Sequence, residues 1–195
     1  MKYHIDDSEE CATEHIKKIV LGTGKTYYVY NDEDPIALVE INSYGYFTDA
    51  IVFGDHVIIG NYYEGIYVIS LSDYSVRNIK IKGYFGYFEI DKDVLYVLGC
   101  ENIVAFDRDL EWLWESDYLA VDGVVCNGIE DNTMMISCEM DPPGGWIKRK
   151  IEGITFSFID DGKYRICRGY SDVVLVSTRF SSLCCTDINT GKSWN

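Results

Sequence analysis

The sequence predicts an all-β fold: a small β-propeller of about five short blades, each with three or four antiparallel strands. Apolar runs of strand length recur along most of the chain and are rich in β-forming residues. Polar breaks interrupt them every few residues, which excludes a helical period. The runs also form units that repeat every 30 to 40 residues. A period in this range, with several strands per repeat and no helices, is typical of a propeller.

The stretch 88–114 shows the repeated unit most clearly. Residues 94–98 are an uninterrupted apolar run, and residues 99–102 (Gly-Cys-Glu-Asn) read as a turn. A second apolar run follows at 103–106, after which a polar segment turns the chain toward Trp112. Three short strands joined by tight turns therefore account for this unit.

Aligning the apolar runs on their first residues places the other strands. The second strands are predicted to start at Tyr27, Val57, Val94, Met134 and Val173. The third strands are predicted to start at Ile36, Ile66, Ile103, Ile147 and Leu183. Inner first strands are expected at 50–53, 87–90, 124–126 and 164–167, and outer fourth strands at 76–81, 112–118 and 154–159.

The two ends of the chain suggest how a ring could close. The last unit stops at Trp194-Asn195 without an outer strand, and the N-terminal run from Ile16 to Leu21 has no unit of its own. We therefore expect this run to pair beside residues 183–188 and to close the ring, because closure removes open sheet edges. Residues 1–195 are interpreted as one propeller domain that begins with an acidic leader, 1–14.

The end of the last unit resembles a known repeat. Residues 185–194 (Cys-Thr-Asp-Ile-Asn-Thr-Gly-Lys-Ser-Trp) look like the D-x-x-T-G-x-x-x-W end of a quinoprotein-type propeller repeat, and 105–112 is a looser copy without the glycine. The resemblance implies propeller blades. The quinone-binding members of that family are much larger, secreted and calcium-dependent, and none of their cofactor ligands can be placed on this sequence. We therefore expect no cofactor.

Composition narrows the classes of partner. The formal net charge is −15, which would repel nucleic acid and anionic membranes and would attract a cationic protein. The apolar runs are far shorter than the roughly 20 residues of a spanning helix. The acidic N-terminus lacks the apolar core of a signal peptide, and the seven cysteines show no metal-binding spacing. We expect a cytoplasmic protein with structural thiols.

The candidate binding site follows from the wiring of a propeller, in which turns between second and third strands emerge on one face. Four of these five turns carry acid, and some carry tyrosine or tryptophan. The predicted partner-binding residues are Asp32, Asp34, Tyr62, Tyr63, Glu64, Glu139, Asp141 and Trp146. Connections between blades should add further residues to the same face: Tyr84, Phe85, Tyr118, Asp122, Asp160 and Asp161. Trp146 follows a Pro-Pro-Gly-Gly loop, which either tucks it against the blade or presents it to a partner.

No catalytic set stands out. His4, His15 and His56 have no spacing that indicates a metal site or a catalytic pair, so we expect a protein that is not an enzyme. The leading hypothesis is an acidic interaction module, most concretely an immunity protein that neutralises a cationic, ribonuclease-type bacterial toxin. In type, such a chain is similar to immunity proteins of contact-dependent toxin systems. The alternatives are a quinoprotein-like propeller that binds a small molecule and a scaffold propeller.

Overall fold

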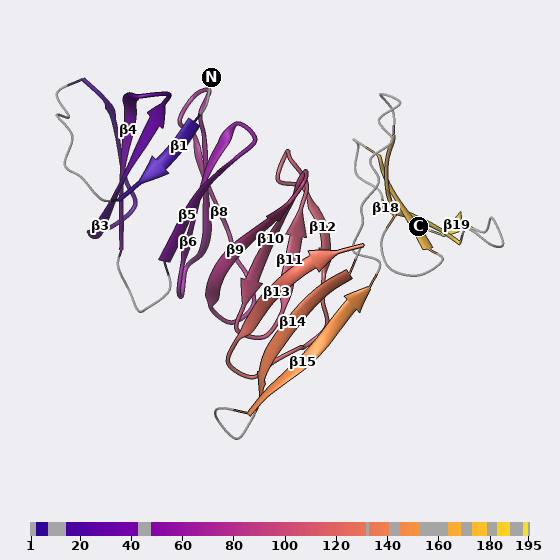
Figure 1. Ribbon diagram of the computed structural model, residues 1–195. Coiled ribbons are helices and arrows are strands. Elements are labelled where there is room, and N and C mark those ends of the chain that lie inside the picture. The colour runs from indigo at the N-terminus through magenta and orange to yellow at the C-terminus, as the bar shows by residue number, and fades with distance from the viewer. Residues whose placement is uncertain are drawn as a thin grey trace.

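A computed structural model describes residues 3–7, 15–42, 48–131, 133–140, 145–152, 164–168, 173–178, 183–187 and 193–194, the last four ranges as backbone only. Within these ranges the secondary structure is all β, without a helix, and the strands form five small sheets (Figure 1). The predicted all-β class is therefore confirmed.

Each sheet comes from one continuous part of the chain. The first contains β1 (Tyr3–Asp6), β2 (Lys17–Val20), β3 (Gly24–Asn31) and β4 (Asp34–Asn42). The second contains β5 (Thr48–Phe53), β6 (His56–Asn61), β7 (Gly65–Ser70) and β8 (Val76–Ile79). The third contains β9 (Phe85–Asp91), β10 (Val94–Gly99), β11 (Ile103–Phe106) and β12 (Trp112–Glu115). The fourth contains β13 (Val124–Glu130), β14 (Thr133–Met140) and β15 (Gly145–Glu152). The fifth contains β16 (Tyr164–Arg168), β17 (Val173–Thr178), β18 (Leu183–Asp187) and β19 (Ser193–Trp194).

The predicted strand pattern is confirmed in all five units. β3, β6, β10, β14 and β17 contain the predicted second strands, and β4, β7, β11, β15 and β18 contain the third strands. The second, third and fourth sheets are antiparallel meanders that begin with the predicted inner strand. The outer strands β8 and β12 lie where expected, whereas the predicted strand at 154–159 falls outside the described residues.

Among the residues whose side chains the structure describes, the core consists of three apolar clusters, and each joins two successive sheets. One cluster lies between the first and second sheets, the next between the second and third, and the last between the third and fourth. β10 shows why its run is apolar throughout. Leu95 and Val97 point into the second cluster, whereas Val94, Tyr96 and Leu98 point into the last. Side chains alternate along a strand, so a strand buried on both faces needs apolar residues at every position.

The predicted closure by the N-terminal strand is wrong. β2 pairs with β4 in parallel, with Ile19 opposite Val39, and joins the first sheet. Ile19 is 7% exposed and packs in the first apolar cluster, while Lys18 lies 2.6 Å from Glu40. The place beside β18 is taken by β19, whose Trp194 pairs with Cys185. β1 and β18 lie at opposite ends of the row of sheets (Figure 1).

The corresponding strands of the first and second sheets also run in opposite directions. β1 pairs with β3, so the sheet order is β1-β3-β4-β2 and the acidic leader supplies a strand that the sequence pattern did not predict. The end of β4 lies beside the end of β6, because Asn61 Nδ2 donates to the Asn42 carbonyl at 2.7 Å. β4 and β6 therefore end at the same face, and β3 runs opposite to its predicted counterpart β6. Because β2 precedes β3 in the chain, only β4 and β5 lie between β3 and β6, whereas three strands lie between β6 and β10, and this accounts for the short spacing of 30 residues between Tyr27 and Val57.

Candidate functional site

Three tyrosines form the centre of one face of the molecule, which we call the tyrosine face (Tyr62, Tyr63 and Tyr84). Tyr62 and Tyr63 lie in the turn between β6 and β7, and Tyr84 precedes β9. The ring of Tyr62 stacks on Tyr84 with centroids 4.4 Å apart and meets Tyr63 edge-on at 4.3 Å. Tyr63 is 71% exposed. Two neighbouring sheets thus place a small aromatic cluster at the surface.

The turn that carries Tyr62 and Tyr63 is tight because of its last residue. Glu64 N–H donates to the Asn61 carbonyl at 3.1 Å, and Gly65 follows with φ of 85°. A Cβ at Gly65 would lie 2.4 Å from the Ile79 carbonyl oxygen, so glycine is required both by φ and by space. The turn is therefore held in one shape against β8.

Tyr84 links the aromatic cluster to the turn between β10 and β11 and to the connection between β12 and β13. Its hydroxyl donates to Asp122, its amide donates to Cys100 Sγ at 3.2 Å, and its carbonyl accepts from Cys100 N–H at 3.0 Å. Burial, followed by the hydrogen bond to Asp122, raises the pKa of Tyr84 above its ordinary value. The neutral phenol therefore serves as a fixed link between the third sheet and the segment that enters β13.

Asp122 is followed by Gly123, which lies beside the ring of Trp146 at the start of β15. Glu139 N–H donates to the Gly123 carbonyl at 2.9 Å, and Val121 N–H donates to the Glu139 carbonyl at 2.8 Å. Trp146 is the cross-strand partner of Glu139, and a Cβ on Gly123 would lie 3.6 Å from its ring. Trp146 is nevertheless 48% exposed. Trp146 therefore packs on Gly123 with about half of its surface open to solvent.

Four of the predicted site residues therefore share one strip across three sheets: Tyr62, Tyr63, Glu139 and Trp146. Tyr84 and Asp122 join them as expected, and Tyr118, 58% exposed, lies in the same connection as Asp122. Phe85 does not belong to this surface, because it is fully buried and packs on Phe88.

Glu64 has an internal role. Its carboxylate accepts from the Tyr67 hydroxyl at 2.9 Å and from Asn42 Nδ2 at 3.2 Å. Burial, followed by this hydrogen bond, raises the pKa of Tyr67 to about 12. Glu64 therefore joins the first sheet to the second, and its charge serves that contact.

Asp32 and Asp34 lie on the opposite face. They belong to the turn between β3 and β4, where Asn31 pairs with Tyr3. Tyr3 in turn lines a hollow with Asp55 and His56, at the end of β6 away from Tyr62. The reversed first sheet is the physical reason for the difference. Asp141, Asp160 and Asp161 fall outside the described residues.

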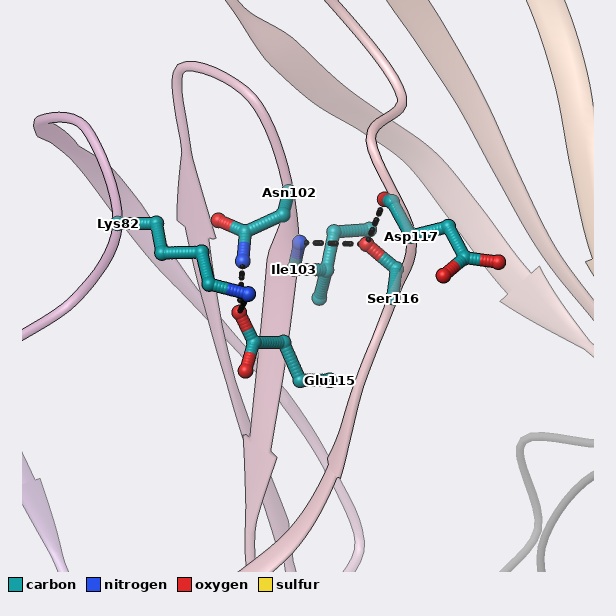
Figure 2. A network of polar contacts seen from close by, with 6 residues as sticks. All are labelled: Lys82, Asn102, Ile103, Glu115, Ser116 and Asp117. Carbon is teal, nitrogen blue, oxygen red and sulfur yellow. Dashed lines mark hydrogen bonds and ion pairs between the residues drawn. The ribbon is translucent and has the colours of Figure 1, made fainter.

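A polar network supports the tyrosine face from within the third sheet (Figure 2). The amide of Asn102, which is 3% exposed, donates to Glu115 Oε1 at 2.7 Å, and Lys82 Nζ lies 2.8 Å from the same oxygen. Ser116 Oγ accepts from Ile103 N–H at 3.0 Å and donates to the Asp117 carbonyl at 2.9 Å. The network fixes the turn 100–102 and the start of the connection that carries Tyr118 and Asp122.

This network yields a prediction, because a buried and an exposed group share one carboxylate oxygen. Asn102→Ala removes the buried donor and should lower the free energy of unfolding by about 2 kcal/mol. Lys82→Ala removes a lysine whose side chain is 72% exposed and should change it by less than about 1 kcal/mol. Urea unfolding of both variants measures the difference, and equal losses would contradict the assigned roles.

Within the described part of the chain, no three His, Cys, Asp or Glu side chains are arranged to hold a metal ion. Cys100, Cys126 and Cys138 are unpaired thiols, and burial raises the pKa of each. Cys126 and Cys138 pack in the cluster between the third and fourth sheets, and Cys100 is buried and accepts a hydrogen bond from Tyr84 N–H, which supports the predicted structural role of these three. None of the described segments forms a helix able to cross a membrane.

Comparison of the chain with models of known protein families finds no match, and comparison with curated proteins finds none either.

Proposed function

We propose that this chain is a protein-binding module that docks a cationic protein on its tyrosine face. The observation that carries the proposal is the continuous strip from Tyr63 through Tyr84 and Asp122 to Trp146. Buried tyrosine and tryptophan anchors supply much of the affinity of protein interfaces. Here they come from three sheets and are held by ring stacking, by the hydrogen bond from Tyr84 to Asp122 and by the packing of Trp146 on Gly123, so little order has to be gained on binding.

The charge of the strip indicates the sign of the partner's charge. Acidic residues lie beside the aromatic ones: Asp122 accepts from the Tyr84 hydroxyl, Glu139 is the cross-strand partner of Trp146, and Asp117 precedes the exposed Tyr118. The formal net charge of the chain is −15. Such a surface attracts a basic protein over long range and repels the phosphates of nucleic acid. A polar and acidic rim around aromatic anchors is the arrangement expected for a basic protein partner.

The concrete form of the proposal is an immunity protein that occupies the basic active site of a ribonuclease-type toxin. An acidic surface with exposed aromatic rings can imitate the phosphates and bases of RNA. The partner to test is therefore the product of a neighbouring gene with a basic C-terminal domain. If that gene product does not bind, the immunity-protein hypothesis is contradicted, whereas the broader proposal of a protein-binding module is not.

For the architecture, we propose that the five sheets are blades of a propeller. Two observations on the first four sheets support it: they pack face to face in succession through the three apolar clusters, and their first strands contact one another in order, β1 with β5, β5 with β9, and β9 with β13. A closed ring of this length should have a radius of gyration of about 16 Å. Small-angle X-ray scattering measures it, and a clearly larger value would indicate an open row.

The docking face is tested by two tryptophans of equal exposure. Trp146 is 48% exposed and Trp112 is 50% exposed, but Trp112 lies at the opposite end of the third sheet. Trp146→Ala should weaken binding by about 2 kcal/mol, or roughly thirtyfold, mainly through faster dissociation. Trp112→Ala should bind as wild type. Surface plasmon resonance with the captured partner measures both rates, and a larger loss for Trp112→Ala would place the interface elsewhere.

A rim charge should act on the association rate instead. Asp117 projects away from the polar network (Figure 2), and its side chain is exposed. Asp117→Lys should slow association, with little change in dissociation, and the effect should shrink as salt is added. Glu64→Lys is unsuitable for this purpose because it would also break the bonds to Tyr67 and Asn42. An association rate that does not depend on salt would contradict the proposed electrostatic steering.

A further inference from the structure

The three rings of the tyrosine face form an open corner. The planes of Tyr62 and Tyr84 differ by 29°, so each of these rings covers one face of the other, whereas Tyr63 stands at 73° to Tyr62. Tyr63 is 71% exposed, and its ring is therefore the open aromatic surface of the cluster. The tight turn that ends at Gly65 holds the backbone of Tyr63 in one shape, so this surface is formed before a ligand arrives.

A carboxylate lies beside this corner. Asp122 Oδ1 accepts a hydrogen bond from the Tyr84 hydroxyl, and Asp122 is exposed. Asp122 also acts on Tyr62, because loss of solvation, followed by Tyr63 and then by Asp122, raises the pKa of Tyr62. The pKa of Tyr84 is raised as well, so both phenols are neutral at pH 7. The negative charge of the corner therefore belongs to Asp122.

The lysines that precede Tyr84 in the chain are engaged elsewhere. Lys80 Nζ donates to the Glu64 carbonyl oxygen at 3.1 Å, and Lys82 Nζ lies 2.8 Å from Glu115 Oε1. Among the ion pairs of the residues that the structure describes, none includes Asp122. The carboxylate beside the rings is therefore not neutralised by a described cation of this chain, and its charge acts on a cation that approaches from outside.

We infer that the tyrosine face recognises an arginine side chain of its partner, whose guanidinium stacks on the Tyr63 ring and donates hydrogen bonds to Asp122. The inference rests on the proposed docking function and names the side chain that the partner contributes. A guanidinium is planar and weakly hydrated and carries five N–H donors in its plane, so it can stack on a ring and donate to a carboxylate at once. The ammonium group of lysine is compact and strongly hydrated, and it lacks a flat face to stack.

The experiment follows the tyrosine ring signals by nuclear magnetic resonance during titrations with two acetylated peptide amides of equal charge, tetra-arginine and tetra-lysine, at constant ionic strength. The arginine peptide should shift Tyr63 saturably and bind roughly tenfold more tightly than the lysine peptide. Tyr63→Phe keeps the ring and should keep this preference. Tyr63→Leu should reduce it to about twofold or less, whereas Trp112→Leu, which removes an exposed ring at the other end of the third sheet, should leave it unchanged.

Two charge variants test the carboxylate. Asp122→Asn should weaken binding of the arginine peptide about tenfold, because a hydrogen bond to a charged group is lost. Glu111→Gln removes one charge from an exposed position just before β12, away from the rings, and should change the constant by less than about twofold. Unchanged melting temperatures of the variants ensure that each result reports binding.

Three outcomes would overturn the inference. The two peptides could bind with equal constants, or Asp122→Asn and Glu111→Gln could weaken binding equally, and either result would indicate attraction of cations by net charge alone. Alternatively, adenosine monophosphate could shift Tyr63 where the arginine peptide does not, and the ring would then stack on a base. Failure of the docking function is a separate result: it is shown when Trp146→Ala leaves the affinity for the captured partner unchanged, whatever the choice between arginine and lysine.

Discussion

Deleting residues 1–21 is expected to lower the free energy of unfolding by roughly 4 kcal/mol, since it removes both strands that flank the β3–β4 hairpin. β1 pairs with β3, and β2 pairs with β4. The deletion also takes Ile19 out of the first apolar cluster and exposes Val39 and Tyr27, which pack there. A two-stranded hairpin left at the end of the row would hold its face against the second sheet only weakly.

Two single substitutions isolate the packing part of this effect. Ile19→Ala should cost about 3 kcal/mol, because its side chain is 7% exposed. Val20→Ala, at a position 59% exposed, should stay within about 0.5 kcal/mol of wild type. Urea unfolding gives the free energies, and hydrogen exchange of the deletion should show lost protection in β3 and β4. If protection were instead lost only in β18, the N-terminal strand would pair in the last sheet, and the pairing of β2 with β4 would be contradicted.

Strand positions could be predicted from the sequence because the sheets are stacked. In β10 every position is buried, and in β6 every position after His56 is, so the chain shows uninterrupted apolar runs at Val57 and Val94 that mark strands clearly. β1 gives no such signal. Its four residues alternate between half-buried and exposed, and acidic residues follow it. A short edge strand that buries little apolar surface is hard to distinguish from a polar leader.

Strand direction could not be predicted in the same way. An alternating pattern has a period of two in either direction, so Tyr27 and Val57 align equally well whether β3 and β6 run together or oppositely. The reversal becomes visible only through contacts such as that between Asn42 and Asn61. For this reason the sequence pattern predicted one face for Asp32 and Tyr62, which lie on opposite faces.

The shared face of the candidate site could be predicted where the strand connections follow the repeat. Tyr62, Tyr84 and Trp146 come from the second, third and fourth sheets, whose strands follow the repeat, and the expected shared face is found there. What each side chain does on that face depends on contacts between distant residues. Glu64 bonds to Asn42 and Tyr67, and Asn102 bonds to Glu115, so their roles are structural. The hollow beside His56 also forms from turns more than 50 residues apart in the chain.

Gly60→Ala is expected to destabilise the protein by about 3 kcal/mol through overpacking. Gly60 is buried near the end of β6, and a Cβ there would lie 2.1 to 2.3 Å from three atoms of the Phe85 ring. Phe85 is fully buried and also packs on Phe88, so the ring has little room to move. This contact between the second and third sheets requires the absence of a side chain at position 60.

A double-mutant cycle separates overpacking from the intrinsic effect of replacing glycine in a strand. Phe85→Ala alone should cost about 4 kcal/mol, and adding Gly60→Ala to it should cost nothing further, because the ring is gone. Gly123→Ala is the matched control: its Cβ would meet the Trp146 ring at 3.6 Å, an ordinary contact. That variant should remain within about 1 kcal/mol of wild type. If the losses at Gly60 and Phe85 are instead additive, the two residues do not share the space, and the close packing of the second sheet on the third must depend on other contacts.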